Sequence, residues 1–218
     1  LPPTRFYSLM HQRLIREYPA IKASKQTYDS GCGVHPLCHS FIDADGIVNI
    51  ISSPCHDLVK GSNPNKEMIS GNLSIMEVVD SVLAMPEVVG KSYRLLIPVA
   101  QTDDEQNCLP FCERRHWTLL FITDKEARHY DSTGFRSKPY GLCNIEKAVK
   151  TIDLELKRYY LGHQGAINNK DCGLFVMTYI LLLLENKQIS PILTESVLAM
   201  FPNIQPKVVA SAAADKAP

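Results

Sequence analysis

The sequence has no excess of charge of either sign, because 23 lysines and arginines balance 23 aspartates and glutamates. Nucleic-acid-binding proteins usually carry a basic excess, so we expect no nucleic-acid partner. Charged residues make up 21% of the chain and hydrophobic residues 45%. That balance is typical of a folded globular protein and excludes an intrinsically disordered one.

Long hydrophobic runs are also missing. The longest, at residues 179–184, is far shorter than the roughly 20 residues that cross a bilayer, so we expect no membrane span. The N-terminal residues show no charged segment followed by an apolar one, and we therefore expect no signal peptide there. The chain also begins without methionine, as an excised domain would.

Disulfide bonds are not needed for folding either. A chain of 218 residues buries roughly 70% of its unfolded surface and can fold without cross-links. Its seven cysteines are odd in number and scattered. This pattern favours reduced thiols in a cytosol-like compartment, where each cysteine is available for chemistry.

The periodicity of the apolar residues predicts an α+β fold, with strands and helices in no regular alternation. Ser74 and Glu77 form a capping box before one of the helices. The region 24–65 is expected to be loop-rich, because glycine and proline recur in it. The expected helices are residues 6–21, 75–85, 144–152 and 172–184, and the expected strands are residues 47–51, 93–100, 117–123, 127–131 and 154–161.

We expect one domain over residues 1–201, followed by a flexible tail at 202–218 that is rich in alanine, serine and lysine. Within the domain, residues 1–90 form a divergent part suited to substrate recognition, and residues 91–201 form the catalytic core. We expect this domain to be a monomer.

Cys172 stands where a polar segment, ending in Asp171, gives way to an apolar helix. Unpaired backbone N–H groups and the helix macrodipole at such a place favour the thiolate form of a cysteine. Gly173 leaves room for a substrate backbone beside the sulfur. A small apolar residue that merely starts a buried helix would give the same pattern, so Cys172 alone does not decide the function.

A thiolate nucleophile needs a base, and the base needs a group that orients it. His116 opens one strand of the expected hairpin, and Asp131 closes the other. Antiparallel pairing around Asp124 brings these two strand ends together. The alternative is a surface histidine and a turn-forming aspartate, but the cysteine downstream favours a catalytic set.

In this order His116-Trp117, Asp131-Ser132, a glutamine and Asp171-Cys172-Gly173 resemble the ubiquitin-like-protease (Ulp) family of cysteine proteases, clan CE and C48-like. The family includes SUMO-specific proteases, the adenovirus protease and deubiquitinases secreted by bacterial pathogens. The resemblance covers residues 93–184 and is nearest to the bacterial-effector branch. It implies a central mixed sheet flanked by helices, with the catalytic cysteine at a helix N-terminus.

The resemblance also implies roles for individual residues. Cys172 would be the nucleophile, His116 the general base and Asp131 the residue that orients it. Trp117 would shape a narrow channel for a Gly-Gly tail. Gln164, together with the backbone N–H of Cys172, would stabilise the oxyanion.

The chain departs from the family pattern at three points. Gln164 lies eight positions before Cys172, slightly farther than usual, so Asn168 or Asn169 is an alternative oxyanion donor. The 15 positions from His116 to Asp131 are somewhat fewer than in the SUMO proteases, which a shorter hairpin accommodates. The single tryptophan of the chain leaves it without a second one that SUMO proteases use to close the channel.

The N-terminal third contains an alternative chemistry, a group of cysteines and histidines that could supply zinc ligands. Their spacing fits no standard zinc finger, and reduced loop residues explain them more simply, so we expect no metal and no cofactor. The group consists of Cys32, His35, Cys38, His39, Cys55 and His56, and the pair Cys108 and Cys112 lies farther along.

Three acidic residues, Asp103, Asp104 and Glu105, precede the His116 strand. They could meet the arginines near the C-terminus of ubiquitin, or they could form an ordinary solvated loop. Together with the family resemblance they favour a deubiquitinase that cleaves after a C-terminal Gly-Gly. The expected partners are therefore conjugates of ubiquitin or of a ubiquitin-like modifier.

Three alternative functions stay open. The first is an isopeptidase specific for SUMO or NEDD8. The second is an effector acetyltransferase that uses acetyl-CoA on the same Cys-His arrangement, although such enzymes usually pair the histidine with glutamate. The third is a silent ubiquitin-binding module. If the protein is a bacterial effector, we expect it to be secreted into the host cytoplasm.

Overall fold

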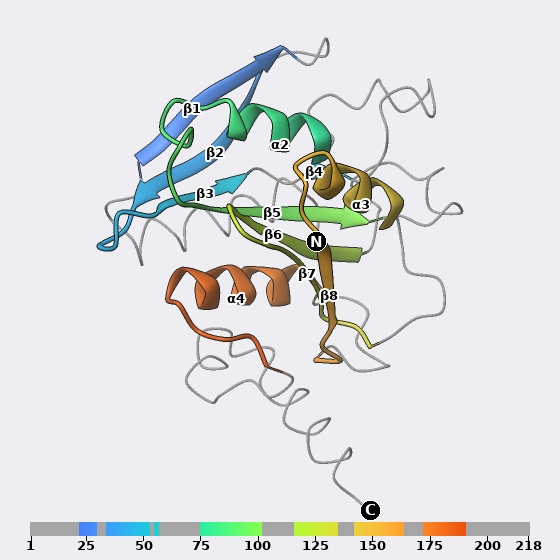
Figure 1. The fold of residues 1–218 in the computed structure, drawn as a ribbon. Coiled ribbons are helices and arrows are strands. Elements are labelled where there is room, and N and C mark those ends of the chain that lie inside the picture. The colour runs from blue at the N-terminus through green and yellow to red at the C-terminus, as the bar shows by residue number, and fades with distance from the viewer. Residues whose placement is uncertain are drawn as a thin grey trace, which may run out of the picture.

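The computed structural model describes residues 22–29, 34–52, 55–56, 75–101, 116–134, 142–163 and 172–190. Its centre is one eight-stranded sheet (Figure 1), in which the strands lie in the order β1-β2-β3-β5-β6-β7-β8 and β4 pairs with β5. The strands are β1 (Lys22–Asp29), β2 (Val34–Ile42), β3 (Val48–Ser52), β4 (Cys55–His56), β5 (Tyr93–Gln101), β6 (His116–Thr123), β7 (Ala127–Asp131) and β8 (Leu156–Tyr160).

The sheet is mixed. β1 to β3 form antiparallel pairs, as do β5 to β7. Parallel pairing joins β3 and β4 to β5, and β7 to β8. Since parallel neighbours need crossover connections, the helices lie on the faces of the sheet.

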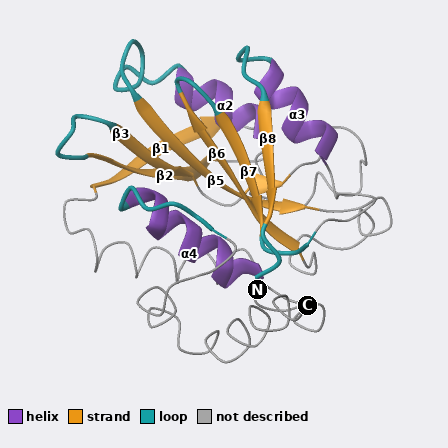
Figure 2. Cartoon of the chain, turned by 60° about the horizontal axis from the view of Figure 1, so that its bottom comes forward, coloured by secondary structure: helices purple, strands orange, loops and turns teal. Residues whose placement is uncertain are grey.

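Helices cover both faces of the sheet, as Figures 1 and 2 show. α2 (Ile75–Leu83) and α3 (Leu142–Lys150) lie on one face, and α4 (Cys172–Leu184) lies on the other. Two apolar clusters fill the spaces between these layers. The α+β class and the central mixed sheet flanked by helices, both predicted from the sequence, are confirmed.

β6 is buried on both faces over nearly its whole length. Its side chains alternate between the two clusters. Trp117, Leu119 and Phe121 pack toward α4, whereas Leu120 and Ile122 pack toward α2 and α3. A strand in the middle of a sheet with both faces covered reads as a continuous apolar run, which is why its sequence is so hydrophobic.

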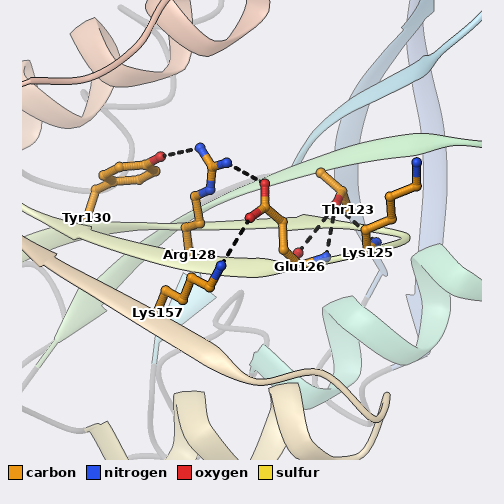
Figure 3. Close-up of polar contacts among 6 residues, drawn as sticks. All are labelled: Thr123, Lys125, Glu126, Arg128, Tyr130 and Lys157. Carbon is orange, nitrogen blue, oxygen red and sulfur yellow. Dashed lines mark hydrogen bonds and ion pairs between the residues drawn. The ribbon is translucent and has the colours of Figure 1, made fainter.

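Polar contacts fix the turn that joins β6 to β7 (Figure 3). The Thr123 hydroxyl accepts hydrogen bonds from the backbone N–H groups of Lys125 and Glu126, each at 3.1 Å. The Glu126 carboxylate pairs with Arg128 and lies 3.9 Å from the Lys157 ammonium of β8. These contacts hold the pairing register of β6, β7 and β8.

The predicted hairpin around Asp124 is confirmed, and so are the strands predicted near residues 47–51, 93–100 and 154–161. The helix predicted at residues 172–184 is present with the same bounds. Those predicted at 75–85 and 144–152 are also present, each shifted or shortened by about two residues.

The prediction of a loop-rich region at residues 24–65 is wrong for its first half, where β1 and β2 form a hairpin. Gly46 turns the chain between β2 and β3 with φ 75°. Pro36 lies within β2 opposite Thr27, beside a shift in the pairing register where a missing N–H is tolerated.

Several predictions concern residues outside the described ranges, among them the helix at 6–21, the Ser74 cap and the tail at 202–218. The division of the chain at residue 90 stays a prediction, although β3 and β5 pair within one sheet across it. No helix in the part of the chain that the structure describes is long and apolar enough to cross a bilayer.

Candidate active site

The pairing of β6 with β7 places His116 and Asp131 on the same face of the sheet. Tyr130 lies opposite Leu119, and continuing that register puts Asp131 opposite Thr118, two residues from His116. The Nε2 atom of His116 lies 2.9 Å from Oδ1 of Asp131. The contact expected from the hairpin is therefore present, and both side chains are buried.

Asp131 is held in place by its own turn. Its Oδ1 atom also accepts hydrogen bonds from the backbone N–H of Thr133 at 2.9 Å and from the Thr133 hydroxyl at 2.7 Å. Burial alone would raise the pKa of Asp131, but the His116 ring and the two Thr133 donors outweigh it and lower that pKa. The carboxylate is thus ionised and fixed in orientation.

Cys172 is the first residue of α4 and is 1% exposed. Its side chain hydrogen-bonds the His116 ring. Because Nε2 of that ring faces Asp131, Nδ1 is the nitrogen left for the sulfur. The cysteine, the histidine and the aspartate, 56 residues apart at the extremes, thus meet at one corner of the sheet.

The protonation of His116 follows from these contacts. Burial lowers the pKa of the ring, but the hydrogen bonds with Asp131 and Cys172 and the negative charge of Asp131 raise it to about 9. At neutral pH the ring is therefore an imidazolium between a carboxylate and a sulfur.

Of the other residues predicted for the site, two are described. Trp117 is 1% exposed and packs in the same apolar cluster as Cys172. Gly173 is buried as the second residue of α4. The predicted oxyanion donors Gln164, Asn168 and Asn169, and the acidic residues Asp103, Asp104 and Glu105, lie outside the described residues.

Among the residues that the structure describes, no group of three or more histidine, cysteine or acidic side chains could hold a metal ion. Cys55 is buried and makes no disulfide. His35, Cys38 and His39 belong to β2, and His56 belongs to β4. Cys32, Cys108 and Cys112 lie outside the described ranges.

Comparisons with known proteins find a similar fold but no sequence family. No protein-family model and no curated protein matches the sequence. Among solved structures, the Legionella pneumophila effector protein RavZ matches with a TM-score of 0.55 and 13% identity, over 95% of this chain and 62% of that chain. The fold is similar to that of RavZ.

A second RavZ structure, in complex with human LC3B, matches with a TM-score of 0.53 and 13% identity, over 95% of this chain and 59% of RavZ. The chain thus spans about three fifths of the RavZ structures that it matches. The SUMO protease Ulp1 superposes on 55% of this chain and 53% of its own, with 18% identity and a TM-score of 0.35, which is too low to identify a common fold.

Three residues near the site were not singled out from the sequence. Thr133 donates twice to Asp131, once from its backbone N–H and once from its hydroxyl. His163 is 2% exposed and bonded to α4. His129 is 1% exposed, and neither ring nitrogen has a hydrogen-bond partner among the described residues. For His129, its place in the middle of the expected strand 127–131 was the signal available in the sequence.

Proposed function

We propose that this chain is a cysteine protease of the Ulp type that cleaves after the C-terminal Gly-Gly of ubiquitin or of a ubiquitin-like modifier. The observation that carries the proposal is the buried chain of contacts from Asp131 through His116 to Cys172 at the start of α4. A nucleophile, a base and an orienting carboxylate in contact are the set that covalent acyl transfer needs.

The raised pKa of His116, about 9, shapes the mechanism. The ring holds its proton before substrate arrives and can serve as a general acid. The thiolate attacks the glycine carbonyl carbon, and the Cys172 backbone N–H stabilises the oxyanion, with Gln164 as the proposed second donor. His116 then protonates the leaving amine as the C–N bond breaks and a thioester remains.

Hydrolysis of the thioester completes the cycle. The now neutral His116 takes a proton from water, which attacks the thioester carbonyl. The C–S bond breaks, Cys172 leaves as a thiolate beside the protonated His116, and the glycine carboxylic acid of the released modifier gives its proton to solvent. Asp131 keeps its charge throughout and stabilises the imidazolium form of the ring.

The burial of Cys172 supports a slender substrate. Only 1% of the residue is exposed, which favours a substrate without bulky side chains next to the scissile bond. A Gly-Gly tail meets that requirement. Trp117, which belongs to the same apolar cluster as Cys172, is the residue that we propose shapes the channel.

Two modifier classes are favoured by different observations. The acidic run Asp103, Asp104 and Glu105 would complement arginines near the C-terminus of ubiquitin and favours a deubiquitinase. The likeness of fold to RavZ, whose structure was solved in complex with human LC3B, favours a modifier of the LC3 type. That likeness also supports a role as a bacterial effector in the host cytoplasm.

The test uses ubiquitin, SUMO, NEDD8 and LC3B with thiol-reactive C-terminal warheads, incubated with the protein. The expected result is a covalent adduct with ubiquitin or LC3B that Cys172→Ala abolishes. An adduct with SUMO or NEDD8 would keep the mechanism and change the substrate. No adduct with any modifier would contradict the proposal, and acetyl transfer from acetyl-CoA would then be measured.

A further inference from the structure

The segment after β8 is bonded to the turn that carries Asp131. The backbone N–H of Leu161 donates to the carbonyl oxygen of Asp131 at 2.9 Å, and that of Gly162 donates to the carbonyl oxygen of Thr133 at 3.2 Å. Gly162 has φ 69°, a backbone conformation that glycine adopts without strain. The chain therefore turns at Gly162 while attached to the acidic side of the site.

The next residue, His163, forms hydrogen bonds with α4 and with the segment that follows α4. Its Nε2 lies 2.7 Å from the carbonyl oxygen of Ser190, and its Nδ1 lies 2.7 Å from the hydroxyl of Tyr179 in α4. A carbonyl only accepts, so Nε2 carries a proton and donates. In the neutral ring Nδ1 then accepts from Tyr179, whose hydroxyl stays protonated because burial and the negative charge of Asp131 raise its pKa.

The His163 ring rests on the face of α4 that begins with Cys172. Cys172, Phe175 and Tyr179 are spaced i, i+3 and i+7, which places them on one side of the helix. His163 stacks on Phe175 at 6.0 Å between ring centroids, and its ring lies 5.7 Å from that of Tyr179. The segment after β8 therefore connects two parts of the site. Its main-chain hydrogen bonds hold the turn that carries Asp131, and the His163 ring contacts the helix that begins with Cys172.

Hydrophobic packing alone does not fix the rotation of α4. Every residue of the helix except Leu174 is buried, so the helix is apolar all round and non-directional contacts favour several rotations almost equally. A buried hydrogen bond is directional, and a polar group in an apolar seam sets the register of a helix. Within the described part of the chain, the Tyr179–His163 bond is such a contact.

We propose that His163 is a positioning residue that fixes the rotation of α4 so that Cys172 lies within hydrogen-bond reach of His116. The inference rests on the proposed function, because it assigns His163 a role in activating the proposed nucleophile. His163 acts through Tyr179 and the Asp131 turn and does not contact the reacting atoms. It also immediately precedes Gln164 in the sequence.

The readout is the rate at which iodoacetamide alkylates Cys172 in the folded protein, followed by mass spectrometry of the peptide that contains it. The rate at pH 6.5 is divided by the rate at pH 9.5, which cancels differences in access to the sulfur. An ordinary thiol gives a ratio of about 0.01, because thiols titrate near pH 8.5. The urea-unfolded protein supplies that reference, and the native protein is expected to exceed it at least tenfold.

His163→Phe keeps the aromatic stacking and removes both hydrogen bonds. We expect it to lower the ratio about tenfold, and Tyr179→Phe to do the same by removing one hydroxyl. The double variant should lower the rate ratio no further than either single variant does, because each of the three variants breaks the same Tyr179–His163 hydrogen bond. His163→Asn, whose carbonyl can accept from Tyr179, should stay within about threefold of the native ratio.

Val82→Ala in α2 is the matched control, since it weakens the core on the opposite face of the sheet. It should lower the melting temperature and leave the ratio unchanged. A native ratio with His163→Phe in a folded protein would overturn the positioning role and leave the proposed function intact. A native protein with the ratio of the unfolded chain would overturn both, because Cys172 would then not be activated by His116.

Discussion

At the scale of single residues, the site depends on one carboxylate oxygen. Oδ1 of Asp131 accepts from His116 and twice from Thr133. Hydrogen bonds to a charged group contribute more than neutral ones, so each donor both lowers the pKa of Asp131 and fixes its direction. The orientation of His116 therefore depends on Thr133 as well as on Asp131.

Replacement of Thr133 tests this dependence. Thr133→Ala removes the 2.7 Å hydroxyl bond to Asp131 and keeps the backbone N–H bond. A hydrogen bond to a charged group contributes roughly 1.5–3 kcal/mol, so we expect the rate of adduct formation with the reactive modifier to fall about tenfold. Thr133→Ser keeps the hydroxyl and should stay within about twofold of the native rate. Equal losses in both variants would show that the hydroxyl does not matter.

At the scale of elements, the site lies where three segments converge. β6 brings His116, β7 brings Asp131 and α4 brings Cys172. The hairpin carries its own register through the Thr123 and Glu126 contacts of its turn. The segment after β8 connects the helix to the hairpin through His163.

Gly162 makes that connection possible. Its φ of 69° is in the left-handed region, and no atom lies within 4 Å of the position that a Cβ would occupy. Gly162→Ala should therefore lower the free energy of unfolding by about 1–2 kcal/mol through backbone strain without a steric clash. Urea denaturation measures the change.

Gly134→Ala is the control, since that position is equally open and its φ lies outside the left-handed region. It should change stability by less than about 0.5 kcal/mol. Similar losses for the two variants would contradict the strain argument, because both add the same methyl group to open space.

At the scale of the whole molecule, two buried histidines oppose each other in the pH dependence of stability. His116 has a folded pKa of about 9 against an ordinary value of 6.5. The contribution of His116 to the free energy of unfolding is fully present below pH 6.5 and is lost as the pH rises through 9. His129 is buried, and burial lowers its pKa from 6.5 to about 4. Because the unfolded chain binds this proton more readily, His129 lowers the free energy of unfolding as the pH falls from 6.5 through 4. The two effects together predict that stability is greatest near pH 6.5.

His129→Leu should remove the acid limb of this curve. The difference between the folded and unfolded pKa corresponds to about 3 kcal/mol at most. Chemical denaturation from pH 4 to pH 9 should show the variant gaining most stability at pH 4. It should also be at least as stable as the native protein at pH 7, because both ring nitrogens lack partners within the described residues.

Thr118→Val is the matched control for that series. The Thr118 hydroxyl is buried on the same face and has no hydrogen-bond partner among the described residues, but it does not titrate. The variant should shift stability equally at every pH. If His129→Leu also changed the free energy of unfolding equally at every pH, the loss of stability at acid pH could not be assigned to His129.

The sequence by itself determined the elements and the chemical types at the site. The unbroken apolar run after Gly173 predicted the bounds of α4. The hairpin spacing was enough to bring Asp131 beside His116, because local pairing follows from the turn. The β1–β2 hairpin was missed since glycine and proline are ambiguous between a loop and the ends of short strands.

Only the tertiary structure decided what lies next to Cys172. The contact with His116 joins residues 56 positions apart, and the bonds of His163 to Tyr179 and Ser190 depend on how an all-apolar helix is rotated against the sheet. Neither periodicity nor spacing specifies that rotation. The protonation of His116 and the neutrality of His129 likewise follow from burial and neighbouring charges, which exist only once the layers have packed.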